Sequence, residues 1–268
     1  MAAKPELEIA ELREIQLEML CEIDSFCKKN KLSYYLSNGT LLGAVKYKGF
    51  IPWDDDIDIV MPRRDYDSFV EKYVNTDRYS LFSIERNGAY RFPFSKFCDT
   101  RTVKNEFEYN NGVKLGVDID IFPIDDARSL EDAVSVIRKS QKLMNHLFWA
   151  KINILPSSNP VFTAIKACRI FAYRAYGASR VCRRMIANAR RDVSGAAYKG
   201  CFVWPVYAER EIIPAEVFSD TVSVEFEGHQ FPAPIGYDTY LHSLYGDYWQ
   251  DPPLEKQKTH HSFKAYRL

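Results

Sequence analysis

Aspartates alternate with isoleucines in two short segments of the chain, and this pattern is the first candidate for chemistry. The segment DDDIDIV carries Asp54, Asp56 and Asp58, and the segment VDIDIF carries Asp118 and Asp120. Successive side chains of an extended strand point to opposite faces, so the aspartates of each segment share one face. Large apolar residues flank both segments, and charges enter such surroundings only when they are paired or bind a metal.

Converging carboxylates of this kind favour a divalent metal ion. Like charges at short distance raise each other's pKa unless a cation neutralises them, and carboxylate oxygens suit Mg²⁺ or Mn²⁺. If the two acidic strands are neighbours, their carboxylates complete one site. An EF-hand calcium loop is excluded, because the glycine at its sixth position and its closing glutamate are missing. The alternative interpretation is a solvated acidic surface, which is the commoner meaning of an acidic run.

A glycine and a threonine, Gly39 and Thr40, follow a short β-prone run, LSYYLS, and precede the first acidic segment. We expect a turn here, followed by a helix that Gly49 closes. The backbone N–H groups of this turn and the Thr40 hydroxyl would face a phosphate. Lys48 and Lys96 are candidate cations for the same phosphate, although a lone lysine more often lies on the surface.

Hydrophobic periodicity predicts a mixed α/β fold. An amphipathic helix is expected at residues 6–30, and strands and helices then alternate up to residue 125. The stretch from Ser129 to Arg191 has helical periodicity, and β-type segments return after Gly195. We therefore expect a catalytic core in residues 1–128, a helical insertion or lobe in residues 129–194, and a C-terminal segment, 195–268, that completes the catalytic domain.

The segment SNGTLLGAVKYKGFIPWDDDIDIVMPRRDYDSF resembles the signature of the LicD family of phosphocholine transferases, whose distant relatives include fukutin and fukutin-related protein. The likeness covers residues 36–69 and extends to SKFCDTRT, VDIDIFPIDD and LYGDYWQDPP. It implies a nucleotidyltransferase-like fold for the mixed sheet core, whereas the helical insertion or lobe carries no motif of the family. It also implies transfer of phosphocholine, or a related phospho-alcohol group, from a CDP-linked donor such as CDP-choline to a glycan hydroxyl, with release of CMP. The acceptors in this family belong to teichoic acids or lipopolysaccharide.

The resemblance assigns roles to individual residues. It implies metal ligation by Asp56, Asp58 and Asp120, with Asp118 as a further candidate. Either Asp120 or Asp118 would take the proton of the acceptor hydroxyl. Lys46 stands where many members carry arginine, so a cation is kept but a bidentate phosphate contact is lost.

Several alternatives remain open at this level. His260 and His261 either close the donor site or belong to an exposed tail. The fold also suits a nucleotidyltransferase that releases pyrophosphate, or a non-catalytic module that binds a nucleotide or a glycan. The intact set of mutually repelling carboxylates argues against the non-catalytic module.

The composition indicates a globular protein without strong overall charge. Its 36 basic and 36 acidic residues cancel, and 46% of residues are hydrophobic, which excludes a disordered chain and a strongly basic nucleic-acid binder. The N-terminal residues lack the features of a signal peptide, and the six cysteines form no CxxC pair. We therefore expect a cytoplasmic protein with free thiols.

One stretch of the chain departs from this charge balance. Residues 161–191 contain eight lysines and arginines and no acidic residue, interleaved with apolar side chains. Such a stretch either lies on an anionic membrane at the inner face, near lipid-linked acceptors, or packs its apolar side on the catalytic domain.

Overall fold

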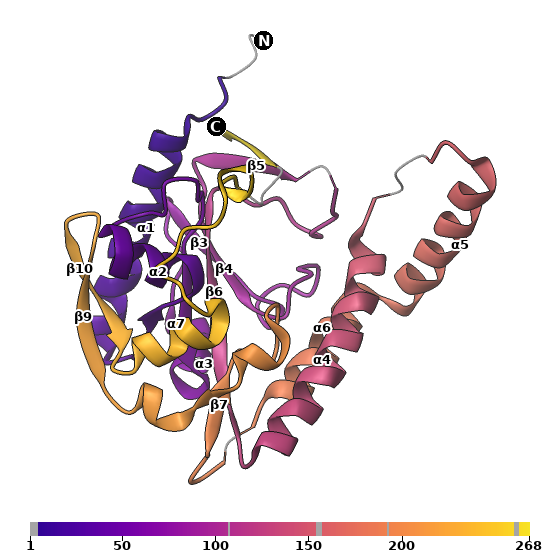
Figure 1. The fold of residues 1–268 in the computed structure, drawn as a ribbon. Helices are drawn as coiled ribbons and strands as arrows, with labels where there is room; N and C mark the ends of the chain where they lie inside the picture. The colour runs from indigo at the N-terminus through magenta and orange to yellow at the C-terminus, as the bar shows by residue number, and fades with distance from the viewer. Residues whose placement is uncertain (1–4, 107, 154–156, 192, 260–262) are drawn as a thin grey trace.

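A mixed seven-stranded sheet lies at the centre of the structure (Figure 1). The computed structural model describes residues 5–106, 108–153, 157–191, 193–259 and 263–268. The strands are ordered β1 (Tyr35–Leu36), β2 (Asp58–Pro62), β6 (Asp118–Ala127), β4 (Ser95–Asp99) and β3 (Tyr79–Phe82), while β7 (Tyr198–Gly200) pairs with β6 and with β8 (Ile213–Pro214).

The register of the three central strands brings charged side chains together. Strand β2 runs parallel to β6 with Asp58 opposite Asp120, and β4 runs antiparallel to β6 with Lys96 opposite Asp120. These residues therefore form one row across the sheet. The prediction that the two acidic segments are neighbours is confirmed.

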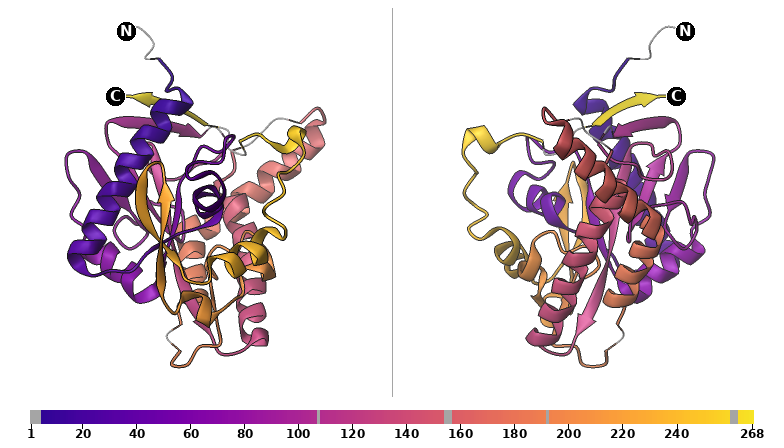
Figure 2. Two further views of the ribbon diagram at one scale, coloured as in Figure 1. Left: turned by 60° about the vertical axis from the view of Figure 1, so that its left-hand side comes forward. Right: turned by 90° about the vertical axis from the view of Figure 1, so that its right-hand side faces the viewer.

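Helices cover both faces of the sheet, because residues of the central strands alternate between two apolar clusters. On β2, Ile59 and Met61 join the cluster formed with α1, α2 and α3, whereas Val60 joins the cluster formed with α4 and α6. The two views of Figure 2 show α1 and the α4–α6 pair on opposite sides. These helices are α1 (Ile9–Asn30), α2 (Asn38–Tyr47), α3 (Arg63–Lys72), α4 (Leu130–Lys151) and α6 (Ala178–Ala189).

The remaining elements lie around this core. Helix α5 (Pro160–Tyr176) projects from the body next to α4 (Figure 1), and Ile170 is its one buried residue in the described part of the chain. Two strand pairs lie outside the main sheet, β9 (Thr221–Phe226) with β10 (His229–Pro234) and β5 (Thr102–Glu106) with β11 (Phe263–Arg267). The others are α7 (Tyr237–Tyr245) and the 3₁₀ helices η1 (Ala208–Glu211), η2 (Ala215–Phe218) and η3 (Leu254–Lys256).

The mixed α/β fold is confirmed, but three local predictions are wrong. The first acidic segment is not a strand throughout, since β2 begins only at Asp58. The side chain of Arg13 donates to the carbonyl oxygens of Ile51, Pro52 and Asp54 at 2.6–3.1 Å, so this backbone bends around a guanidinium instead of pairing in a sheet.

The other two corrections concern the turn expected at Gly39 and Thr40 and a strand expected after Gly195. Gly39 and Thr40 lie in the first turn of α2, not in a turn before it. Of the β-type segments expected after Gly195, the run CFVWPVYAE (residues 201–209) is not a strand, because β7 ends at Gly200, and helix α7 was not predicted. The division of the chain at residues 128 and 194 stays a prediction.

A buried ion pair joins helix α3 to strand β6. Arg63 donates to both carboxylate oxygens of Asp125, at 2.8 and 2.6 Å, and Asp125 is fully buried. A bidentate pair of this kind holds the start of α3 against the far end of β6.

We expect Asp125→Asn to lower the free energy of unfolding by about 3–5 kcal/mol, because the buried guanidinium of Arg63 would lose its bidentate counter-charge and keep only the partly exposed Asp67 at 3.8 Å. Asp126→Asn is the control, since its pair with Lys199 is partly exposed and contributes less than about 1 kcal/mol. Urea unfolding followed by circular dichroism measures both. Equal losses in the two variants would contradict this account.

Candidate functional site

The first turn of α2 holds Asp58 in place. The backbone N–H of Asp58 donates to Thr40 Oγ1 at 2.8 Å, and Asn38 Nδ2 donates to Asp58 Oδ2 at 3.0 Å. Tyr240 of α7 donates to Asn38 Oδ1 at 3.2 Å and fixes the amide in turn. The buried Thr40 hydroxyl thus contacts the backbone of the acidic strand.

Three further carboxylates lie on the loop before β2. The side chains of Asp54, Asp55 and Asp56 each offer an oxygen within 4.8 Å of the others. A Cβ atom at Gly39 would lie 2.6 Å from Asp54 Oδ2, so glycine at this position leaves room for the carboxylate. Although this loop is not a strand, Asp54, Asp56 and Asp58 still face one cavity.

Lysines neutralise part of this negative charge. Buried Lys96 pairs with Asp118 at 2.5 Å and also with Asp120, and Lys104 pairs with Asp118 at 2.6 Å. Burial acts to raise the pKa of Asp118, but Lys104 and Lys96 outweigh it and lower that pKa to about 2. Asp118 is therefore an ionised and fully compensated carboxylate.

Other carboxylates of the row lack such compensation. Burial, together with Asp56 and Asp120, raises the pKa of Asp58 well above its ordinary value, and burial with Asp56 raises that of Asp54 to about 7. Within the described residues, neither forms an ion pair with a lysine or arginine. Hard oxygen donors with unbalanced charge fit a divalent cation, so the site passes this test for a metal.

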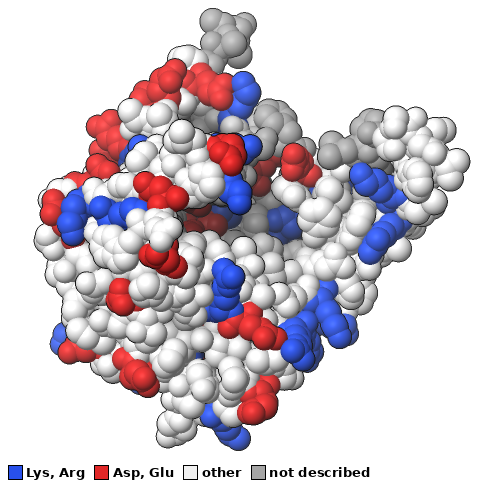
Figure 3. Space-filling view, viewed as in Figure 1, with Lys and Arg blue, Asp and Glu red and all other residues white. Residues whose placement is uncertain are grey.

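Two cavities meet at these carboxylates. The first has a volume of about 720 Å³ and the second about 410 Å³, and both are lined by Asp56, Asp120 and Trp204. Figure 3 shows this hollowed face between the sheet and the projecting helices, with side chains of both charges around the hollow. A reacting group bound at the acidic row is thus reachable from two sides.

The first cavity contains many of the residues expected to bind a donor. Gly39 and Lys46 line it together with the acidic residues. Lys46 Nζ contacts Asp251 Oδ1 at 2.6 Å and the Tyr248 carbonyl at 3.3 Å. The segment LYGDYWQDPP therefore reaches the same cavity as the first turn of α2.

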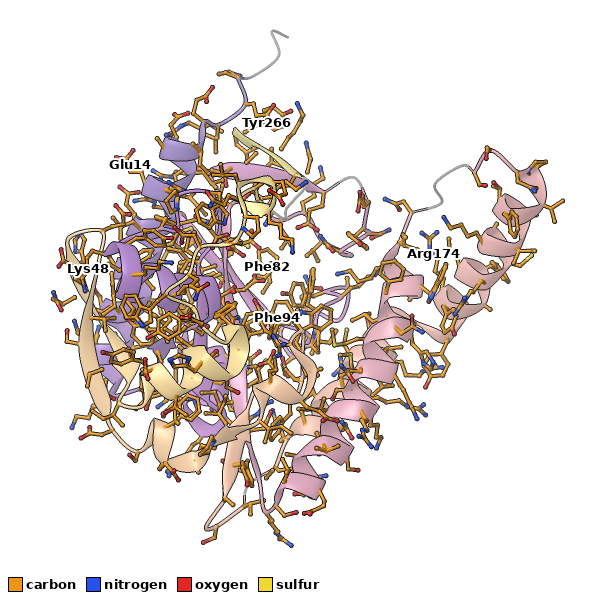
Figure 4. The ribbon with its side chains drawn as sticks, viewed as in Figure 1. Glu14, Lys48, Phe82, Phe94, Arg174 and Tyr266 are labelled. Atoms are coloured by element: carbon orange, nitrogen blue, oxygen red, sulfur yellow. The ribbon has the colours of Figure 1, made fainter. Side chains whose placement is uncertain are left out.

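Other predicted residues lie elsewhere. Lys96 and Asp118 line the second cavity. Lys48 is exposed at the end of α2 and lines neither cavity, and Figure 4 places it far from Phe94. His260 and His261 lie outside the described residues.

The structure adds site residues that the sequence pattern did not indicate. Trp204 stands between the cavities, Glu211 and Tyr207 line the first, and Lys151 lines the second. Trp204 precedes a proline in a segment interpreted as a strand, and Lys151 ends a helix without a recognisable motif. No local signal in the sequence marks these residues, because only the tertiary fold brings them to the row.

Comparisons with known proteins identify a family to which the chain is similar. Residues 31–162 match the family model described as LicD/FKTN/FKRP, nucleotidyltransferase domain. The chain is 32% identical to the lipopolysaccharide cholinephosphotransferase LicD of Haemophilus influenzae, over 96% of this chain and 98% of that protein. It is also 29% identical to an uncharacterized protein of Rickettsia prowazekii, over 35% of this chain and 36% of that protein.

Buried Glu211 gives this site a testable pH dependence. Burial raises its pKa to about 8, although the backbone N–H groups of Tyr207 and Val206 act against this. The folded protein thus keeps a proton that the unfolded chain, with an ordinary value of 4.5, has released. Stability from this group is present below about pH 4.5 and is lost as pH rises towards 8.

We expect Glu211→Gln, which does not titrate, to gain stability relative to the wild type by up to about 1.4 kcal/mol per pH unit across this window. Urea unfolding at pH 5, 6.5 and 8 measures the difference. A constant difference at all three values would show that Glu211 is ionised in the folded protein.

Proposed function

The chain belongs to the LicD family of transferases, and we propose that it moves phosphocholine from CDP-choline to a hydroxyl group of a cell-surface glycan precursor, releasing CMP. The observation that carries this proposal is the partly compensated row of carboxylates, Asp54, Asp56, Asp58 and Asp120, at the junction of two cavities. Each substrate of a two-substrate transfer needs its own space, and both must reach one reacting phosphorus atom. The named activity of the Haemophilus influenzae relative supports the choice of phosphocholine.

In this proposal Asp56, Asp58 and Asp120 hold Mg²⁺ or Mn²⁺. Such a cation, when bound, would neutralise charge on the transferring phosphate and on the departing CMP. Thr40 and Asn38 keep Asp58 oriented through the hydrogen bonds described above. The acceptor hydroxyl attacks phosphorus in line, and its proton passes to Asp120 or Asp118.

The first cavity is the proposed donor site. Its volume of about 720 Å³ lies within the range of cofactor and nucleotide cavities. Lys46 supplies a cation for the diphosphate, and Trp53 and Tyr47 offer aromatic faces to the base or the choline group. The partly buried pair of tyrosines Tyr207 and Tyr245, joined at 3.1 Å, forms the opposite wall.

The activity can be tested through its nucleotide product. Incubation with CDP-choline, Mg²⁺ and a glycan acceptor should release CMP, and Asp56→Asn or Asp58→Asn should lower the rate at least about a hundredfold by removing a metal ligand. Asp77→Asn, at an exposed position, is the control. Pyrophosphate from a nucleoside triphosphate instead of CMP would identify a nucleotidyltransferase, and near wild-type rates in both variants would refute the metal assignment.

The two aspartates of β6 should differ in importance. Asp120 lines both cavities, whereas Asp118 lines only the second and is held by two lysines. We therefore expect Asp120→Asn to lower kcat at least as much as Asp118→Asn. Steady-state kinetics at saturating CDP-choline decide between them, and the reverse order would make Asp118 the essential carboxylate.

Helix α5 is the part of the basic stretch that suits an anionic membrane surface. Its side chains Phe162 and Phe171 are 63% and 76% exposed, and Ile165 is also exposed. By contrast, the apolar face of α6 packs on α4, and Arg190, the residue after this helix, pairs with Asp67. No helix in the described ranges combines the length and apolar character needed to cross a membrane.

We propose that α5 lies in the headgroup region of anionic lipid, where its cations and apolar side chains act together. The protein should sediment with anionic liposomes at low salt, less so at high salt, and not with neutral ones. Replacing Phe162, Ile165 and Phe171 together by serine should abolish sedimentation, whereas Val74→Ser, at another exposed apolar position, should not. Absence of binding to anionic liposomes at low salt would refute the proposal.

A further inference from the structure

Lys151, the last residue of α4, is a buried amine that forms no ion pair within the described residues, although Glu106 lines the same cavity. Its side chain is nearly inaccessible, and Nζ lies 3.1 Å from the centroid of the Phe92 ring. Among the described residues its side chain forms no hydrogen bond and no ion pair, unlike Lys96 and Lys104. Burial lowers its pKa to about 7. An unpaired buried cation costs folding free energy, so a role in binding is the better explanation of its presence.

The position of Lys151 is fixed by its backbone. Its carbonyl accepts a hydrogen bond from the Asn110 N–H at 2.8 Å, and Tyr109 pairs with Ile152 in a β-bridge. The loop that lines the second cavity is thereby joined to the end of α4. The amine is held at the cavity wall, not on a free arm.

The second cavity combines aromatic walls with this amine. Phe94, Tyr109 and Phe148 line it, and Figure 4 shows Phe94 between the sheet and α4. Aromatic faces of this kind stack on sugar rings and on other flat or apolar groups. The cavity also opens onto Asp56 and Asp120, where transfer is proposed to occur.

We propose that the second cavity binds the glycan acceptor and that Lys151 pairs with an anionic substituent, a phosphate or a carboxylate, on the acceptor sugar. This inference rests on the proposed function. The first cavity has the size and the cation expected for a nucleotide donor, so the second remains for the acceptor.

Binding of simple sugars tests this assignment in the full chain. The probes are glucose, glucose 6-phosphate and glucuronate, with dissociation constants measured by ligand-observed NMR. One or both charged sugars should bind the wild type at least about tenfold more tightly than glucose, and the stronger of the two identifies the substituent. Lys151→Met should lose this advantage, while Lys142→Met, on the exposed side of α4, should keep it.

The proposal is overturned if the charged sugars bind no more tightly than glucose, or if Lys151→Met keeps their advantage. Lys151→Arg, which retains the cation, should still bind the charged sugars more tightly than glucose. It is the control that distinguishes loss of the charge from loss of the fold. Lys151→Met should also melt at a higher temperature, since an unpaired charge is replaced by an apolar side chain of similar length. A lower melting temperature in both variants would make Lys151 a structural residue and would also overturn the proposal.

Donor binding separates this inference from the proposed function. CDP-choline should bind the wild type and Lys151→Met with the same dissociation constant, because Lys151 does not line the first cavity. Failure of the wild type to bind CDP-choline would refute the donor, whereas the sugar measurements would still decide the role of Lys151.

Discussion

The structure depends on concentrating carboxylates on the central strands of a covered sheet without balancing them evenly. Asp118 is matched by two lysines, but Asp58, opposite Asp120 on the parallel strand, has burial and like charge around it. If lysines neutralised every carboxylate, none would be left to bind a metal. If lysines neutralised none of them, burying the negative charge would cost more folding free energy. Lys96 lies at the boundary, since it contacts both Asp118 and Asp120, whereas Asp58 forms no ion pair with a lysine or arginine among the described residues.

This uneven balance requires precise placement of the acidic loop. Helix α1 fixes the loop, because the Arg13 side chain donates hydrogen bonds to the carbonyl oxygens of Ile51, Pro52 and Asp54. Gln16 donates to the carbonyl oxygens of Asp55 and Asp118, at 3.1 and 3.4 Å. The loop and strand β6 are therefore held by one helix turn, so α1, which carries no reacting group, sets the distance between the two acidic segments.

Sequence patterns predicted the acidic row because it is encoded locally, by alternation of Asp with Ile and by a specific family signature. They misplaced the start of β2, since the Arg13 contacts that bend the loop come from 38 to 41 residues away. The role of Thr40 in holding Asp58 was also not visible, because it depends on how α2 packs beside β2. Three further site residues could not be predicted for the same reason, because only tertiary packing brings them to the site: Trp204, Glu211 and Lys151.

The two cavities draw on different parts of the chain, and this division bears on specificity. The matched family region, residues 31–162, contains the acidic row and the end of α4, but the far wall of the first cavity comes from residues beyond it, including Tyr207, Glu211 and Asp251. The acidic residues themselves thus come from strands β2 and β6 and from the loop before β2. The second cavity takes most of its wall from the matched region, including Phe148 and Lys151, and shares Trp204 with the first. Changes in Tyr207 or Asp251 would therefore alter the first cavity alone, and changes in Lys151 would alter the second alone, which is the distinction that the proposed acceptor site requires.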